Sequence, residues 1–331
     1  MQRPIYRDFA YKGVEERSII ESVVKSRQHV YANSGSNDDH REQKLATFLS
    51  TPTHIDGDEV LVRMTEFSDD NWRESGAMFD AMIAETTGRH VMSTNLPGID
   101  FFGKDETKSD QMLTTEQIED LKNGSFRKIG GSIMHSVNSA AETFSVTPNY
   151  VLLGTSMSTA LTAAALHAAY EASLTIKGAT LAEPINLIDR SFTALASQFV
   201  YQPTASGYVA VNPQLVREVS EPISTIVRRV FDVPSLGANK LYAQALKQGN
   251  FIADLGDMDH LQNVPIYLTR GAASKVSPEE MFVPLAVHLS QVADVETEVF
   301  GDKATNPHDH PYVLTVQSFI DAAENVLNRQ S

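Results

Sequence analysis

One serine in this sequence lies where its hydroxyl could act as a nucleophile. The apolar run at residues 150–153 has the length and composition of a buried parallel strand, Gly154 ends it, and an Ala- and Leu-rich helix follows directly. Ser156 is therefore expected at a sharp strand-to-helix turn, with the small residues Gly154 and Ser158 two positions away on either side. Backbone N–H groups of the first helical turn would point toward it and could stabilise an oxyanion. The pattern GTSMS predicts a nucleophile, although it also suits a turn without catalytic function.

Strand and helix patterns alternate along the chain from residue 59 to this turn. We expect strands at residues 59–64 and 90–95, with a helix between them that Gly88 closes. Residues 116–144 are largely helical, with three glycines as candidate breaks: Gly124, Gly130 and Gly131. Because strands that alternate with helices form parallel sheets covered on both faces, the fold class is predicted to be α/β, with a mostly parallel twisted sheet.

The alternating pattern is interrupted after a further strand at residues 174–183. Residues 186–250 are mostly helical and are punctuated by prolines, with a candidate hairpin at residues 207–211. The alternation then resumes with a strand, a helix, a strand and a helix at residues 264–271, 278–292, 295–300 and 311–327. Ligands bind at the carboxyl ends of the strands in open α/β sheets, so we interpret the interruption as a mostly helical lid inserted at that edge.

The N-terminal residues precede the alternating pattern. An apolar stripe predicts a helix over residues 14–30, and the polar sequence NSGSNDDHREQ indicates a loop after it. Strands at residues 44–50 and 59–64 are predicted to open the sheet, with IDGDE as the turn between them. His40 lies in the polar loop beside two aspartates. Adjacent residues cannot converge on one metal ion without further ligands, so we expect a solvent-exposed loop there.

The chain therefore divides into three predicted parts. Residues 1–58 form an N-terminal helix and opening strands, residues 59–185 and 251–331 form the α/β core, and residues 186–250 form the inserted lid or cap. With 331 residues, of which 42% are hydrophobic, the chain is long enough to bury one large core together with such an insertion.

Composition excludes several classes of function. The 27 Lys and Arg residues against 42 Asp and Glu residues give a net charge of −15, which argues against a nucleic-acid or anionic-membrane partner. The absence of cysteine excludes disulfides, thiolate catalysis and Cys-ligated metals. The sequence shows neither the apolar segment of a signal peptide nor a membrane-spanning run, so we expect a cytoplasmic protein.

Four segments, taken in order, resemble the α/β-hydrolase fold. They are LPGID after a strand, LLGTSMS as the nucleophile elbow, a strand followed by GAASKVSP where the catalytic acid usually lies, and a His-bearing loop before the last helix. The resemblance covers residues 59–327 and includes the lid. It implies a sheet of the predicted kind and a serine nucleophile at Ser156. We expect no cofactor and no metal.

The acid of the family is not at its usual place. By the family's spacing the carboxylate would occupy Ser274, and neither Ser274 nor Lys275 can orient and stabilise an imidazolium. A minority of the family carries the acid at the end of the preceding strand of the sheet, where Glu183 lies. Asp189 is a weaker substitute, and Glu183 could also be a strand-end or lid-contacting carboxylate without catalytic function.

The base and the oxyanion donors are also inferred from the resemblance. His308 and His310, in NPHDHPY, lie between the last strand and the last helix, and His308 is preferred as the base. A surface loop remains an alternative, and two histidines fall short of a zinc ligand set. The backbone N–H groups of Met157 and Phe67 are expected to bind the oxyanion, although Glu66 replaces part of the family's usual His-Gly pair and would oppose negative charge there.

The leading hypothesis is a serine hydrolase that acts on an ester or similar small acyl substrate. The missing acid at Ser274 and the altered oxyanion segment favour an alternative, a hydrolase-fold protein without turnover that serves as a binding or assembly module. Cofactor-independent lyase or peroxidase-like chemistry would reuse the same positions and is a third hypothesis. The expected partner is the small acyl substrate, and self-association into a homo-oligomer is left open.

Overall fold

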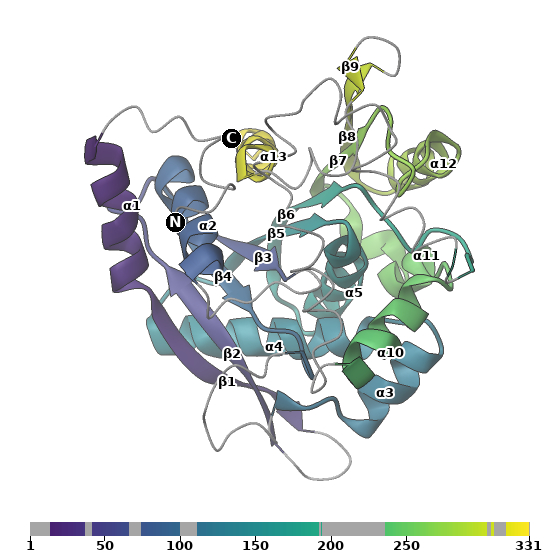
Figure 1. Cartoon of the computed structure of the whole chain (residues 1–331), viewed down its shortest axis with the longest axis horizontal. Coiled ribbons are helices and arrows are strands. Elements are labelled where there is room, and N and C mark those ends of the chain that lie inside the picture. The colour runs from purple at the N-terminus through teal and green to yellow at the C-terminus, as the bar shows by residue number, and fades with distance from the viewer. Residues whose placement is uncertain are drawn as a thin grey trace.

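The computed structural model describes residues 14–36, 42–65, 74–99, 111–191, 193, 236–302, 306–307 and 316–330. Its centre is a sheet whose described strands follow the order β1-β2-β4-β3-β5-β6-β7-β8-β9 (Figure 1). The strands are β1 (Gln28–Ser36), β2 (Glu42–Ser50), β3 (Glu59–Met64), β4 (His90–Thr94), β5 (Asn149–Thr155), β6 (Thr175–Ala182), β7 (Pro265–Gly271), β8 (Asp294–Asp302) and β9 (Asn306–Pro307).

The sheet is mostly parallel, as predicted. The strands from β4 through β3, β5, β6 and β7 to β8 all run in the same direction. Only the edges are antiparallel, with β1 and β2 at one side and the two-residue β9 at the other. Strand β5, which leads to Ser156, lies between β3 and β6 near the middle of the sheet.

Helices cover both faces of the sheet. On one face are α1 (Val14–Ser26), α2 (Glu74–Thr87) and α13 (Val316–Asn328), and on the other are α3 (Thr115–Lys122), α4 (Arg127–Phe144), α5 (Met157–Glu171), α10 (Leu236–Leu246), α11 (Phe251–Leu255) and α12 (Glu279–Leu289). In the described part of the chain, none of these helices combines the length and apolarity needed to cross a membrane.

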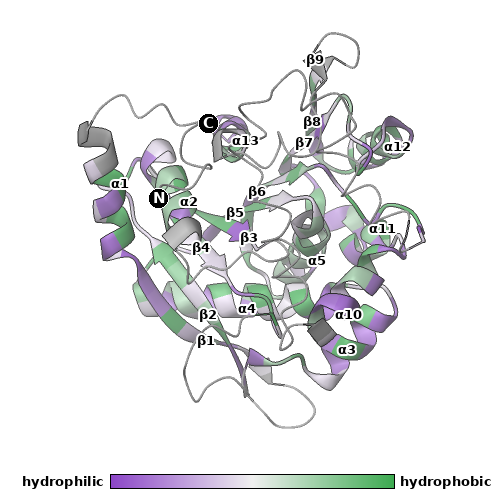
Figure 2. Ribbon diagram, viewed as in Figure 1, coloured by the Kyte–Doolittle hydropathy of each residue, from purple (hydrophilic) through white to green (hydrophobic). Residues whose placement is uncertain are grey.

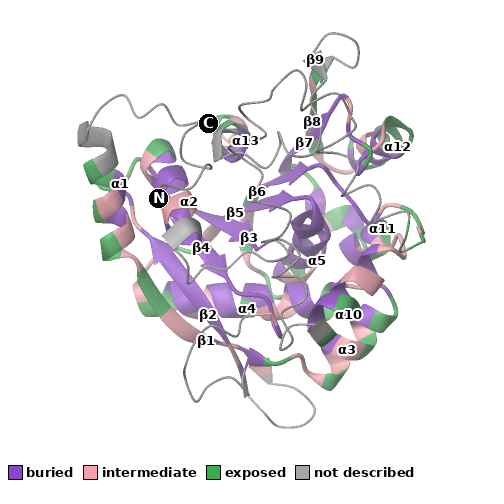
Figure 3. Ribbon diagram, in the orientation of Figure 1, coloured by how far each residue is buried: buried purple, intermediate pink, exposed green. Residues whose placement is uncertain are grey.

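The core consists of one apolar cluster on each face. Along β5, Tyr150 and Leu152 belong to the cluster under α4 and α5, whereas Val151 and Leu153 belong to the cluster under α2 and α13. Because side chains alternate between faces, a strand covered on both sides must be apolar at every position. This accounts for the unbroken apolar run in the sequence and for the buried, hydrophobic centre in Figures 2 and 3.

The N-terminal region differs from the prediction. Helix α1 ends at Ser26, and residues 28–36 form strand β1, so the last residues of the predicted helix and the first of the predicted loop are extended. Strand β1 pairs antiparallel with β2, with a bulge between Asn33 and Ser36 where Gly35 has φ 107°. Pairing with β2 satisfies the backbone hydrogen bonds of this polar segment, and this tertiary context overrides the local pattern. His40 lies outside the described residues.

Two predictions, for the turn before β3 and for the glycines near α4, differ from the structure. Strand β4 lies between β2 and β3, so IDGDE does not form a turn between paired strands. Of the three glycines proposed as breaks, Gly124 separates α3 from α4 with φ 81°, whereas Gly130 and Gly131 lie within α4. A Cβ on Gly130 would lie 2.6 Å from the carbonyl carbon of Ala164, so this glycine allows α4 to pack closely on α5.

The two ends of the predicted insertion meet. The side-chain oxygen of Asn186 accepts hydrogen bonds from the backbone N–H groups of Gly249 (2.8 Å) and Asn250 (3.1 Å), and its carbonyl accepts from the N–H of Phe251 (2.9 Å). The chain therefore leaves the core and returns to it at one place. The action of residues 186–250 as a lid stays a prediction, and the candidate hairpin at residues 207–211 lies outside the described residues.

Candidate functional site

Ser156 occupies the predicted sharp turn between β5 and α5. Its backbone angles, φ 53° and ψ −123°, fall outside the helical and strand regions, and non-glycine residues rarely adopt them. The N–H of Ser156 donates to the carbonyl of Ala182 at the end of β6 (2.8 Å), and the Ser156 carbonyl accepts from the N–H and the hydroxyl of Thr159 (3.1 and 2.6 Å). Such strain persists only where the surroundings enforce it, and it is concentrated at functional sites.

The small residues beside Ser156 are required by close contacts. A Cβ on Gly154 would lie 2.2 Å from the hydroxyl oxygen of Thr162, which in turn donates to the carbonyl of Ser158 (2.8 Å). The Ser158 hydroxyl folds back onto the turn, where it accepts from the N–H of Thr155 and donates to the Thr155 carbonyl, both at 2.8 Å. Ser158 thus fits at the position where the family usually has a second glycine.

Met157 is the first residue of α5 and directly follows Ser156. The N–H groups of the first helical turn have no acceptor within their own helix. The helix therefore does not prevent the Met157 N–H from donating to a ligand beside Ser156. The other predicted oxyanion donor, Phe67, and the neighbouring Glu66 lie outside the described residues. The last described residue before them, Thr65, is buried at the end of β3.

Glu183 directly follows β6 and is fully buried. Its φ of 57° is a left-handed conformation that costs a glutamate free energy, so this is a second strained residue, at the end of the strand next to the one that leads to Ser156. The N–H of Glu183 donates to the carbonyl of Thr269 on β7 (2.8 Å). Ala182, whose carbonyl accepts from the N–H of Ser156, directly precedes Glu183. This hydrogen bond therefore links the backbones of the two strained residues.

The Glu183 carboxylate is held by the loop after β7, where the family usually carries its acid. One carboxylate oxygen accepts from the backbone N–H of Gly271 (2.5 Å), and the other accepts from the hydroxyl of Ser274. The N–H of Ser277 donates to the same Ser274 hydroxyl oxygen (3.2 Å), which orients it. The structure therefore brings together the two positions, Glu183 and Ser274, that the sequence offers as alternative places for the acid.

The other predicted acid and base residues do not lie in the described contact between Glu183 and Ser274. His308 and His310 lie outside the described residues. Asp189 is exposed and its backbone forms an isolated bridge with Gln248, in contrast with the buried Glu183.

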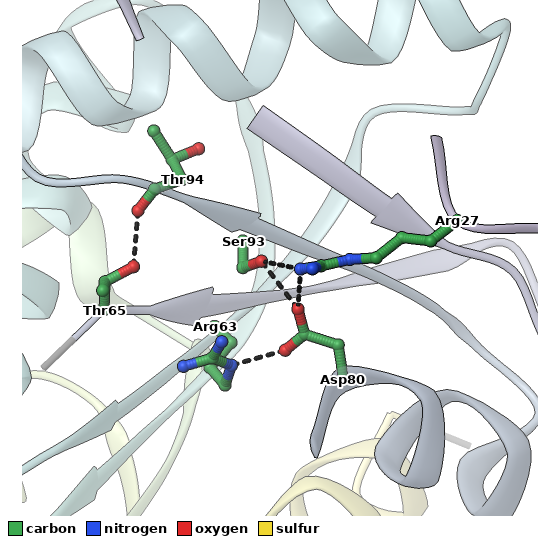
Figure 4. Close-up of polar contacts among 6 residues, drawn as sticks. All are labelled: Arg27, Arg63, Thr65, Asp80, Ser93 and Thr94. Atoms are coloured by element: carbon green, nitrogen blue, oxygen red, sulfur yellow. Dashed lines mark hydrogen bonds and ion pairs between the residues drawn. The ribbon is translucent and has the colours of Figure 1, made fainter. Parts of the chain in front are cut away.

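A buried charge network supports the end of β3, from which the chain continues to the predicted oxyanion segment (Figure 4). The carboxylate of Asp80 on α2 accepts from Arg63 on β3 and from Arg27, each at 2.5 Å, and from the hydroxyl of Ser93 on β4 (2.7 Å). Burial by itself raises the pKa of Asp80, but the two guanidinium groups outweigh it and the pKa is lowered. The hydroxyl of Thr65 donates to a β4 carbonyl (2.5 Å) and fixes the ends of both strands.

Neither this network nor the contact between Glu183 and Ser274 was predicted from the sequence. The sequence did contain a signal for the contact, because Glu183 and Ser274 both closely follow strands that the alternating pattern predicts to be parallel. In the structure Ala182 is the partner of Thr269, and this register places Glu183 beside the start of the loop that contains Ser274. The charges of Arg63 and Asp80 were visible only as polar interruptions of otherwise apolar elements.

Comparison with known proteins gives similarity in structure only. No protein-family model matches the sequence, and no curated protein shows significant sequence similarity to it. Solved structures match along most of the chain. An esterase from Exiguobacterium antarcticum has a TM-score of 0.54 and 14% identity, covering 92% of this chain and 99% of that one. A carboxyl esterase from Bacillus coagulans has a TM-score of 0.54 and 11% identity, covering 91% and 99%.

A bromoperoxidase from Bacillus anthracis matches to a similar degree, with a TM-score of 0.52 and 11% identity over 91% of this chain and 100% of that one. At such identities the similarity concerns the fold. The parallel sheet with helices on both faces and the strained turn at Ser156 agree with it. The chain therefore has the α/β-hydrolase fold.

Proposed function

We propose that this protein is a serine hydrolase that cleaves an ester or similar small acyl substrate. In this proposal the hydroxyl of Ser156 attacks the acyl carbon, and a histidine of the 308–310 loop takes up its proton. Glu183 accepts a hydrogen bond from that histidine, orients it and stabilises its charged form. The N–H groups of Met157 and Phe67 bind the oxyanion of the tetrahedral intermediate.

One observation carries this proposal. Two strained residues, one able to act as a nucleophile and the other as an acid, directly follow two neighbouring strands of the sheet. Ser156 and Glu183 both have positive φ, and the N–H of Ser156 is bonded to the residue before Glu183. A buried carboxylate that receives hydrogen bonds from Gly271 and Ser274 has a fixed orientation, which the acid of a triad requires. The esterases among the similar structures support the choice of substrate class.

The alternative of a binding module loses one of its two arguments. Ser274 at the family's acid position favours this alternative, but the carboxylate of Glu183, directly after β6, contacts that serine. Its other argument, the altered oxyanion segment, concerns residues outside the described ones. The alternative therefore remains as one outcome of the experiments below.

The nucleophile is tested with a fluorophosphonate probe, which reacts with serines activated by a base. We expect the purified protein to be labelled at Ser156, and we expect Ser156→Ala to abolish labelling. Thr159→Ser is a suitable control, because it keeps the hydroxyl that binds the Ser156 carbonyl and should leave labelling intact. No adduct after prolonged incubation, or an adduct on a different serine, would favour the binding module.

The base is tested through pH dependence. Turnover of a simple aryl ester should rise between about pH 6 and pH 7, because only neutral imidazole can accept the serine proton. We expect His308→Ala to lose turnover and His310→Ala to keep most of it, with the same ester as the assay. The reverse result would assign the base to His310, and normal activity in both variants would exclude the proposed triad.

A further inference from the structure

A cavity of about 490 Å³ lies between α12 and β8 and contains none of the proposed catalytic residues. Its size falls in the range of small-molecule sites. The wall is largely apolar, with Phe282, Val283 and Val287 from α12 and Val299 from β8. The three valines are 47–57% exposed and line the same cavity, and exposed apolar side chains that lie together often mark a binding site.

Arg270, on β7, places a buried guanidinium in the wall of this cavity. Its side chain is 3% exposed, its Nε donates to the carbonyl of Ser277 (2.9 Å), and its Nη2 donates to the carbonyl of Ala272 (3.3 Å). Among the described residues, the carboxylate that pairs with Arg270 is that of Glu279, which is 3.9 Å from Nη1, beyond hydrogen-bond distance, on a side chain that is 61% exposed. The guanidinium also lies 5.8 Å from the centre of the Phe282 ring. A guanidinium whose ion pair is this long and solvent-exposed can form a closer, charge-assisted pair with an anion that enters the cavity.

The charge at the rim limits what kind of anion fits. Glu279 remains near Nη1 and partly compensates Arg270, so it would repel a dianion such as a phosphate monoester about twice as strongly as a single negative charge, which favours the monoanion. The planar guanidinium matches the geometry of a carboxylate. Among the described residues of the wall, Thr297 is the one polar side chain besides Arg270 and Glu279, so the rest of the ligand should be apolar.

We propose that this cavity binds a small carboxylic acid with an apolar tail. The carboxylate pairs with Arg270, and the tail lies along the valines of α12 and β8. The inference does not require the function proposed for Ser156, because no residue of the cavity has a catalytic role in that proposal, although Arg270 supports the loop that holds Glu183.

The obvious variant, Arg270→Gln, also disturbs the loop that holds Glu183, because Arg270 binds the carbonyl of Ser277. Val287→Asp avoids this difficulty. Val287 is 57% exposed, so the fold should tolerate aspartate, and the new carboxylate would repel a bound anion. Ile252→Asp on α11 is the matched control, since it makes the same change of charge at a 37% exposed residue outside the cavity.

Binding is measured by calorimetry with hexanoate and with hexan-1-ol, which has the same tail without the charge. We expect hexanoate to bind the wild type and Ile252→Asp alike, to bind Val287→Asp at least about tenfold more weakly, and to bind more tightly than hexan-1-ol. Arg270→Gln should lose the preference for hexanoate over the alcohol. The proposal is overturned if hexanoate does not bind, if Val287→Asp binds it as the wild type does, or if the alcohol binds equally well.

Discussion

Replacing Glu183 with glutamine is expected to reduce kcat for an aryl ester by up to about 10⁴-fold, the cost of the equivalent change in the serine-protease triad. Glutamine keeps an oxygen that can accept from the N–H of Gly271, and the Ser274 hydroxyl can rotate to accept from its amide. The melting temperature should therefore change little. The loss would come from the charge, because an amide cannot stabilise the imidazolium formed when serine attacks.

A second substitution separates a catalytic carboxylate from a merely structural one. Ser274→Asp in the Glu183→Gln background moves the charge to the family's usual position, where it would still contact residue 183, and should restore part of the turnover. Ser274→Asp alone should instead be harmful, since two buried carboxylates in contact cannot both be ionised at neutral pH. If Glu183→Gln leaves kcat unchanged, the carboxylate has no catalytic function, and the binding module becomes the better explanation.

The sequence predicted the central elements of the fold because their patterns are determined by burial. Strand β5 is apolar at residues 150–153 because both of its faces are covered, and helix α2 ends where Gly88 adopts a φ of 63°. Strand β1 was missed because its polar sequence, QHVYANSGS, forms a strand only through pairing with β2. Strand pairing depends on residues far apart in the chain, and local patterns contain little of that information.

The candidate site was predicted in its residues but not in its connections. Ser156 was identified from the small residues around it, and Glu183 from its place at the end of a strand. Their relation to Ser274 depends on the register of two parallel strands and on the left-handed conformation of Glu183, neither of which a sequence pattern specifies. The histidine loop and Phe67 lie outside the described residues, so those two parts of the proposed machinery rest on the resemblance.

The network around Asp80 should have the largest effect on stability. Asp80→Asn removes the carboxylate that pairs with both Arg63 and Arg27, whose side chains are 4% and 7% exposed, and puts a neutral amide in its place. Removing one member of a buried ion pair costs about 3 to 5 kcal/mol in the free energy of unfolding. Urea denaturation at pH 7 measures this, and Glu119→Gln on the exposed side of α3 is the matched control for loss of one carboxylate.

The same network has a defined dependence on pH. The pKa of Asp80 is lowered in the folded protein, so its contribution is complete above the pKa of an unfolded aspartate, about 3.9, and is lost as the pH falls through the lower folded value. The difference in unfolding free energy between wild type and Asp80→Asn should therefore be constant near neutral pH and shrink below about pH 4. A difference that is small at pH 7, or that persists unchanged in acid, would mean that the two arginines find other partners and that the end of β3 does not depend on this carboxylate.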